Sequence, residues 1–347
     1  MRKIQFLLGL TISALALYLA LRGIKWHEVA SALREANYLF LFPAAVALAT
    51  VFACRTWRWR LLFYPLAKPR LSRLFGTITV AYLVNNILPF QLGDLARAYL
   101  LGELEGIRKS RTLSTVVVER MIDILTLVLL LLLLIPFIDV PSWASLPAAT
   151  LGVAFLFLGG LMLAAVLKRD WVIAIVEALP AFLPHRLRAR LKDSAHSAID
   201  GLAVLSQPSL LGQVVAWTVI QWLFSASALY CIMMAFDLDV SFDAAVLVLV
   251  VVSFGFLIPA SPGSIGVYHA LSMKVLESVY AVEASAALSY ALVAHLLYYV
   301  PPIIIGLLFL WQQRFTWARL RAITGQAEAE PVTEEISEEL GEETSEA

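Results

Sequence analysis

Uninterrupted apolar runs constrain this 347-residue chain more than any other feature. They lie at about 4–21, 38–54, 74–89, 112–136, 146–167, 210–235, 243–258 and 285–311. Several reach 18 residues or more, about the length of helix that crosses a hydrocarbon core roughly 30 Å thick. Only 15% of all residues are charged, whereas a soluble domain carries about 25%. The sequence therefore predicts an all-α integral membrane protein.

Two of these runs, 74–89 and 243–258, are too short to cross comfortably, because 16 helical residues rise only about 24 Å. Each continues into a stretch with proline and glycine rather than into a hydrophilic loop. The first run follows Arg2 and Lys3, but its 18 residues exceed a usual signal-peptide core and no clear cleavage site follows. We therefore interpret 4–21 as a retained first span.

Lysine and arginine residues cluster after the second and fifth runs and near residue 317, whereas the loops at 137–145 and 236–243 carry aspartates and no basic residue. Because cytoplasmic loops are enriched in Lys and Arg, both termini are predicted to lie in the cytoplasm, at a bacterial or archaeal cytoplasmic membrane. The stretches 74–111 and 243–284 must then each leave the membrane on the side where they entered. The sequence predicts two re-entrant hairpins that enter from opposite faces.

The two predicted hairpins also match in sequence. Leu88–Leu95 (LPFQLGDL) aligns with Ile258–Ile265 (IPASPGSI) at an offset of 170, and the neighbouring spans keep a similar offset. The chain then divides into two inverted repeats, 1–142 and 143–316, with six full spans in total. Inverted repeats with broken helices are a common plan of membrane transporters. The remaining segment, 317–347, holds nine Glu and no Lys beyond residue 322, which predicts a disordered acidic tail in the cytoplasm.

Polar residues gather around the first hairpin and on the span after it. The predicted binding residues are Asn86, Asp94, Arg97, Glu119, Arg120 and Asp123, with Pro89 and Gly93 as hinge residues. A single ion at the bilayer centre costs about 2.5–3.5 kcal/mol, so these ions must pair, lie near the interface or face water. Two interpretations stay open: a structural ion network, or a polar groove in which Arg97 and Arg120 bind a charged head group through their guanidinium forks.

The second hairpin offers glycines and hydroxyls. Ser264 and His269 are predicted to contact substrate, and the predicted hinge residues are Pro259, Pro262, Gly263 and Gly266. Exposed backbone N–H groups here could bind a phosphate, or the glycines could simply permit a tight turn. By contrast, Trp57 and Trp59, which alternate with Arg55, Arg58 and Arg60, are interpreted as an interfacial belt with a cytoplasmic anchor.

The motifs NNILPFQLGDLARAYLL (85–101), VVVERMIDIL (116–125) and IPASPGSIGVYHA (258–270) resemble the lysylphosphatidylglycerol synthase transmembrane region family. This family includes the flippase half of the multiple peptide resistance factor and stand-alone flippase-like proteins. The resemblance implies roles for the polar motif positions named above. Asp94 stands where glutamate is common in the family, and His269 where an acid is often found.

The resemblance implies a translocase that moves an anionic, aminoacylated or polyprenyl-phosphate-linked lipid between leaflets. After Trp317 no room is left for the family's soluble aminoacyl-transferring domain, so synthase activity is not expected. The chain has no P-loop and no catalytic constellation, and no cofactor, metal or nucleic acid is predicted. The expected partners are membrane lipids, with a homodimer or a separate lipid-modifying enzyme as further candidates. The alternatives are a small-anion secondary transporter and a membrane-embedded enzyme that acts on a lipid phosphate.

Overall fold

The computed structural model describes residues 11–64 (without 12 and 19), 67–87, 92–138, 207–256 and 261–313, together with positions 150, 153, 157 and 160. Nearly all of the predicted fifth span at 146–167, half of the first span at 4–21, and the acidic tail at 317–347 lie outside these residues. Pro89 and Pro259, two of the predicted hinges, also lie outside them.

Within the described residues the protein is helical and contains no strand, as the sequence predicts. The helices are α2 (Trp26–Glu35), η1 (Tyr38–Phe40), α3 (Leu41–Leu62), α4 (Leu71–Ile87), α5 (Gly93–Glu105), α6 (Lys109–Leu134), η3 (Ile135–Phe137), α10 (Pro208–Ala235), α11 (Phe242–Gly255), η5 (Pro262–Ser264), α12 (Val267–Tyr280) and α13 (Ala284–Gln312).

Four of these helical segments are long and apolar enough to cross a membrane: Tyr38–Leu62, Lys109–Phe137, Pro208–Ala235 and Ala284–Gln312. Each has 25 to 29 residues, more than the roughly 20 that a bilayer core requires. Together with the composition, they make this chain an integral membrane protein.

The helices extend further than hydropathy alone predicts. α3 was expected to end near Cys54, yet it continues through three arginines to Leu62. α6 was expected to begin at Thr112 and begins at Lys109. In the extension of α3, Arg55 and Arg58 form ion pairs with Glu119 and Asp123 of α6.

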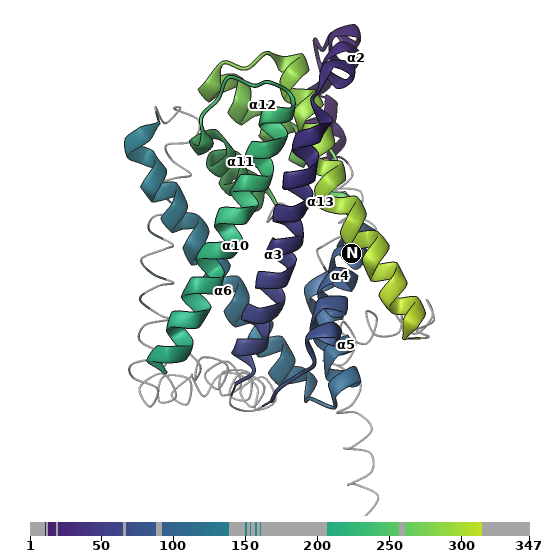
Figure 1. Ribbon diagram of the computed structural model, residues 1–347, viewed down its shortest axis with the longest axis vertical. Coiled ribbons are helices and arrows are strands. Elements are labelled where there is room, and N and C mark those ends of the chain that lie inside the picture. The colour runs from purple at the N-terminus through teal and green to yellow at the C-terminus, as the bar shows by residue number, and fades with distance from the viewer. Residues whose placement is uncertain are drawn as a thin grey trace, which may run out of the picture.

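The helices form an elongated bundle in which α3 and α10 run side by side (Figure 1). Two pairs of shorter helices complete it: α4 packs against α5 near one end, and α11 packs against α12 near the other end. The long helix α13 packs against α4 and also against α12, so it connects the two pairs.

Small residues allow α4 and α13 to approach closely. A Cβ atom on Gly306 of α13 would meet the backbone carbonyl of Thr79, and one on Gly76 of α4 would meet the ring of Phe309. Small residues at such contacts are typical of helix packing in membranes, where dispersion contacts and close backbone approach replace the hydrophobic effect.

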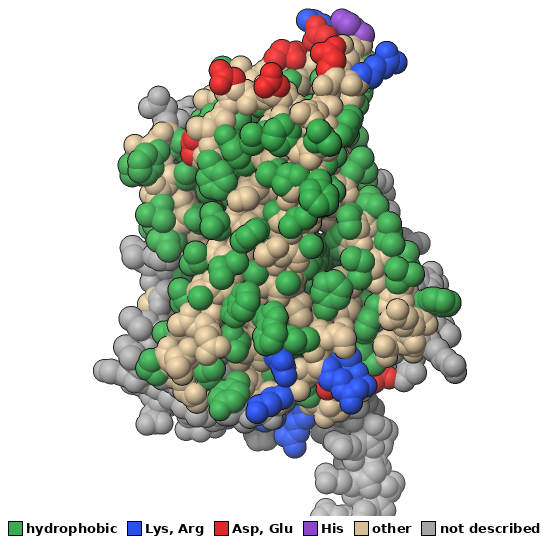
Figure 2. All heavy atoms as spheres, viewed as in Figure 1, with side chains coloured by type: hydrophobic (Ala, Val, Ile, Leu, Met, Phe, Trp, Pro, Cys, Tyr) green, Lys and Arg blue, Asp and Glu red, His purple; other side chains and the backbone are tan. Residues whose placement is uncertain are grey.

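Charge separates along the long axis of the molecule. Acidic side chains gather at the end that carries α2, and lysine and arginine gather at the opposite end, where α4 and α5 lie (Figure 2). A broad apolar surface covers the length between them. This distribution fits a protein whose middle faces lipid.

Candidate functional site

Seven charged residues from three helices meet inside the bundle. The cluster consists of four arginines and three carboxylates: Arg55, Arg58, Asp94, Arg97, Glu119, Arg120 and Asp123. We call these seven residues the ion cluster. α3 supplies two of them, α5 two and α6 three.

Glu119 lies at the centre of the ion cluster and its side chain is fully buried. Its Oε1 accepts hydrogen bonds from Arg55 Nε at 3.0 Å and from Arg58 Nη2 at 3.3 Å. Its Oε2 accepts from Arg97 Nη1 at 2.8 Å. One carboxylate therefore joins α3, α5 and α6, because its two oxygens together offer about four lone-pair sites.

Asp94 and Asp123 complete the pairing. Asp94 receives both Nε (2.6 Å) and Nη2 (2.8 Å) of Arg120 in a bidentate arrangement, and Arg97 Nε lies 3.0 Å from it. Asp123 lies 2.8 Å from Arg58 Nη1 and 3.8 Å from Arg55 Nη2. Asp94 thus pairs with Arg97 within α5 and with Arg120 of α6, and Asp123 of α6 pairs with the arginines of α3.

The ion cluster has four cations and three anions, so it carries one uncompensated positive charge among the residues described. An unbalanced buried charge is expensive unless a counter-ion or water compensates it. The ion cluster is therefore short of one negative charge, which a bound monoanion would supply.

Neighbouring groups hold Arg97 in place. Its guanidinium carbon lies 4.7 Å above the ring of Trp59, within the range of a cation–π contact. The indole N–H of Trp59 donates to Thr115 Oγ1 at 3.0 Å, which fixes the ring on α6. Arg97 is 1% exposed, and its Nη2 has no hydrogen-bond partner among the described residues.

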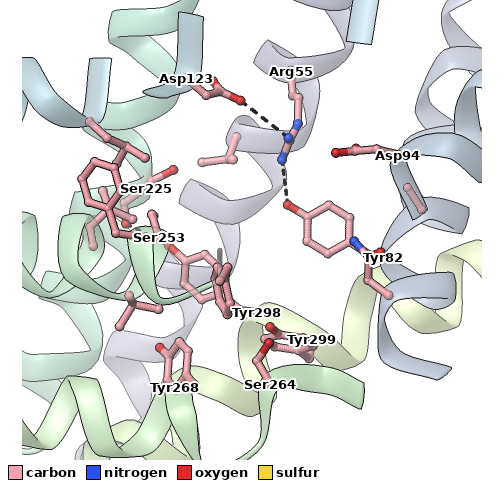
Figure 3. Close-up of a pocket in the computed structure, with 18 of the residues that line it drawn as sticks. Arg55, Tyr82, Asp94, Asp123, Ser225, Ser253, Ser264, Tyr268, Tyr298 and Tyr299 are labelled. Carbon is pink, nitrogen blue, oxygen red and sulfur yellow. Dashed lines mark hydrogen bonds and ion pairs between the residues drawn. The ribbon is translucent and has the colours of Figure 1, made fainter. Parts of the chain in front are cut away.

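A cavity of about 440 Å³ lies next to the ion cluster. This volume is within the usual range of small-molecule sites, about 300–1,000 Å³. Its lining comes from both halves of the chain: α3, α4, α5 and α6 on one side, and α10, α11, η5, α12 and α13 on the other. Arg55 reaches into it and donates to Tyr82 Oη at 2.9 Å (Figure 3).

The cavity has two chemically different sides (Figure 3). Arg55, Asp94 and Asp123 lie on one side, together with Arg97 and Arg120 in the lining. The other side carries hydroxyl and aromatic groups, among them Ser253, Ser264, Tyr268, Tyr298 and Tyr299. The arrangement can bind an anionic group at one side and a hydrogen-bonding group at the other.

The second predicted hairpin forms its tip at η5. Gly263 (φ 71°) and Gly266 (φ 94°) adopt left-handed backbone conformations that glycine tolerates best. Ser264 lines the cavity, whereas His269 does not: its Nδ1 accepts from the backbone N–H of Gly266 at 3.4 Å. Behind the same tip, His295 Nε2 lies 3.0 Å from the carbonyl oxygen of Gly263.

Most of the predicted site residues come together at this cavity. Asn86, Asp94, Arg97, Arg120, Asp123, Gly263 and Ser264 line it. Glu119 lies behind them within the ion cluster, and Gly93 begins α5, where its N–H donates to Asn85 Oδ1 at 2.7 Å. Gly266 and Pro262 shape the second tip without lining the cavity.

Sequence reasoning missed Arg55 and Arg58. The interpretation of both as cytoplasmic anchors is wrong, because Arg58 is fully buried and Arg55 pairs with Glu119. A signal was available: the two arginines are three residues apart, so they share one face of a helix that carries the second apolar run. The belt interpretation is also wrong for Trp59, which is fully buried beneath Arg97, whereas Trp57 is 41% exposed and stacks on Trp217, as an interfacial residue can.

Metal binding has no support in the described part of the chain, where no group of three or more His, Cys, Asp or Glu residues is placed to hold an ion. The polar groups that the site offers a ligand are its arginines, carboxylates, amides and hydroxyls.

These features define a class: a helical integral membrane protein that buries an ion cluster beside a polar cavity between its two halves. Residues 6–306 match the family described as the lysylphosphatidylglycerol synthase TM region, and the chain belongs to that family. The resemblance carried by the three motifs is thereby confirmed.

Relatives that are similar in sequence occur in archaea. Two are described as UPF0104 membrane proteins of Methanothermobacter thermautotrophicus. One is 24% identical over 78% of this chain and 84% of the relative, the other 26% identical over 85% and 91%. A third, described as the glycosyltransferase AglD of Haloferax volcanii, is 25% identical over 85% of this chain. The match spans only about half of AglD, 52% of its length.

Proposed function

We propose that this protein translocates an anionic lipid head group between the two leaflets of the membrane. The observation that carries the proposal is the buried ion cluster with one excess positive charge, beside a cavity that both halves of the chain line. A lipid phosphodiester carries the single negative charge that the ion cluster lacks.

We further propose that α4–α5 and α11–α12 are re-entrant hairpins of an inverted repeat. The helix contacts support this symmetry: α6, which follows the first hairpin, packs against α11 of the second, and α13, which follows the second, packs against α4 of the first. The second spans of the two repeats, α3 and α10, lie side by side. The tips meet as well, since a Cβ on Gly263 would lie 3.0 Å from Asn86 Oδ1.

The head group would enter the cavity while the acyl or prenyl chains stay in lipid. The phosphate would bind Arg97, Arg120 or Arg55, all of which line the cavity, in addition to their carboxylate partners and would supply the missing negative charge. Arg120 is the most available, because its side chain is 42% exposed while Arg97 is 1% exposed. Rocking of one repeat against the other would then open the cavity toward the other leaflet.

Whether translocation needs an energy source depends on whether the lipid moves down or up its concentration gradient. Downhill exchange of lipid between leaflets needs no energy source, whereas uphill transport needs an ion gradient.

A proteoliposome assay tests the proposal. Purified protein is reconstituted with a lipid that carries a fluorophore on one acyl chain, and an impermeant quencher is added outside the vesicles. Translocation exposes inner-leaflet lipid and raises the quenched fraction above the roughly half expected of a symmetric vesicle. Arg120→Gln and Arg97→Gln should slow this movement at least tenfold.

Arg60→Gln is the matched control, because it removes one arginine of α3 that lies outside the ion cluster and stacks on Trp57. Wild-type movement in both arginine variants of the cavity would refute the site assignment. Movement of a soluble anion such as phosphate, without any movement of lipid, would favour a small-anion transporter.

The name of the AglD relative favours a second candidate, a membrane-embedded role in glycosyl transfer. In that case the same vesicles, given a lipid-linked sugar and an acceptor, would yield a new product detectable by mass spectrometry. Product formation without lipid movement would favour this candidate over translocation.

A further inference from the structure

Outside the ion cluster, the described lining of the cavity is uncharged and carries polar groups among apolar ones. Gln221 and Trp222 of α10, Ser253 of α11, Tyr268 of α12 and Tyr299 of α13 all contribute to it. Among the described lining residues, the charged ones are Arg55, Asp94, Arg97, Arg120 and Asp123, all members of the ion cluster. Whatever part of a ligand reaches beyond the phosphate therefore meets amide, indole and hydroxyl groups rather than charges.

The cavity offers no free carboxylate to an ammonium group. Asp94 already receives two nitrogens of Arg120, at 2.6 and 2.8 Å, and Asp123 lies 2.8 Å from Arg58. The ion cluster as a whole is positive by one charge, so a cationic head group would be repelled in a partly buried site where charges are poorly screened.

Two neighbouring polar atoms of α10 are buried without hydrogen-bond partners: Oε1 of Gln221 and Nε1 of Trp222. Gln221 is only 3% exposed. Buried polar atoms are nearly always paired, so two adjacent unpaired ones indicate a ligand or water that pairs with them. One is an acceptor and the other a donor, and both residues line the cavity, so separate hydroxyl groups of a polyol can pair with each of them, since a hydroxyl donates one hydrogen bond and accepts two.

We infer that the head group carried by this protein is a phosphodiester of an uncharged polyol, such as glycerol, inositol or a sugar. The phosphate lies at Arg55, Arg97 and Arg120, and the polyol hydroxyls lie at Gln221 and Trp222. Aminoacylated and other amine-bearing head groups are disfavoured. This inference rests on the proposed function for the site, and it adds the class of head group.

Binding in detergent tests the inference separately from movement. Native mass spectrometry measures competition between short-chain phosphatidylglycerol, phosphatidylinositol, lysyl-phosphatidylglycerol and phosphatidylcholine on the purified full chain. Phosphatidylglycerol and its lysyl ester share one anchor and one phosphate and differ by the aminoacyl group, so they form a matched pair. We expect the two polyol lipids to bind at least tenfold more tightly than the lysyl ester and phosphatidylcholine.

Two variants locate the polyol. Gln221→Leu and Trp222→Phe each remove one hydrogen-bonding group and keep most of the side-chain volume, so each should weaken phosphatidylglycerol binding about threefold to tenfold. Binding of the lysyl ester should stay unchanged within twofold. Gln213→Leu is the control on the same helix, because Gln213 is exposed and its amide donates to Ser209 O of its own helix.

The outcomes separate the two proposals. Lysyl-phosphatidylglycerol or phosphatidylcholine binding as tightly as phosphatidylglycerol overturns the inference, and movement of all four lipids in vesicles would then leave translocation standing. Selective polyol binding without movement supports the inference and refutes translocation. If soluble glycerol phosphate binds as tightly as the lipid, the polyol phosphate assignment survives but the lipid assignment is overturned.

Discussion

Neutralising Glu119 should destabilise the protein strongly, because this carboxylate holds three arginines at 2.8, 3.0 and 3.3 Å in a fully buried position. The variant Glu119→Gln keeps the shape of the side chain but leaves four arginines against two carboxylates. It also directs an amide N–H toward an arginine nitrogen.

The size of the effect follows from the ion pairs that are lost. One pair at about 4 Å contributes about 4 kcal/mol at an effective dielectric constant of roughly 20, but much of this is offset by the cost of taking both ions out of water. Breaking a buried pair by removing one partner costs about 3–5 kcal/mol in total. We therefore expect Glu119→Gln to lose about that much unfolding free energy.

Unfolding of the variant in detergent micelles, followed by circular dichroism during titration with a denaturing detergent, measures this loss. Glu277→Gln is the matched control, because Glu277 is an exposed glutamate of α12, and it should change stability by less than about 0.5 kcal/mol. Adding phosphatidylglycerol should restore part of the stability of the Glu119 variant, since the ion cluster then has two excess positive charges. A Glu119→Gln protein as stable as the parent would refute the description of this cluster as a buried, coupled unit.

Three further predictions address the site, the first tip and the topology. Arg120→Lys keeps the charge but cannot form the bidentate pair with the aspartate of α5, so translocation should fall about tenfold relative to the α3 arginine control. Gly93→Ala should cost about 1–3 kcal/mol, measured as above, because its Cβ would overlap a backbone carbonyl of α4, whereas Gly212→Ala has open space and should cost nothing measurable. In a background without the two native cysteines, Ser110→Cys should react with an impermeant thiol reagent only from the cytoplasmic side and Ser278→Cys only from the outside; reaction of both from one side would contradict the opposed hairpins.

The ion cluster unites a structural and a functional interpretation that the sequence kept apart. It is a structural network, since Glu119 ties three helices together, and it also borders a cavity with an unpaired positive charge. Binding of a phosphate and rearrangement of the helices would then be linked, because the same arginines serve both.

How much of the site could be predicted depended on where each residue lies along the chain. Five site residues could be predicted because they interrupt apolar or kinked segments, where each ion is costly. These are Asp94, Arg97, Glu119, Arg120 and Asp123. The arginines of α3 were misinterpreted, since basic residues at the end of an apolar run have the same pattern whether they face the cytoplasm or turn inward. Only their partners on another helix distinguish the two cases.

Other lining residues gave no signal in the sequence. Gln221, Ser253 and Tyr299 are single polar residues on apolar helices, and such residues often bond only to their own helix, as Ser225 does with Gln221 O. His269 shows the opposite error: it is close in sequence to the lining residue Ser264, yet its ring turns toward the backbone of its own tip.

The sequence by itself determined that this protein lies in the membrane, that it is helical, and to which family it belongs. These conclusions rest on the length of the apolar runs and the order of three motifs, which are local properties of the chain. It also determined which ions needed partners. Only the tertiary structure showed which residues pair with these ions and that α3 contributes to the ion cluster. It also showed that one positive charge stays unbalanced beside a cavity whose other lining residues are uncharged. Those facts depend on distances between helices that are far apart in the chain, and no local pattern encodes such distances.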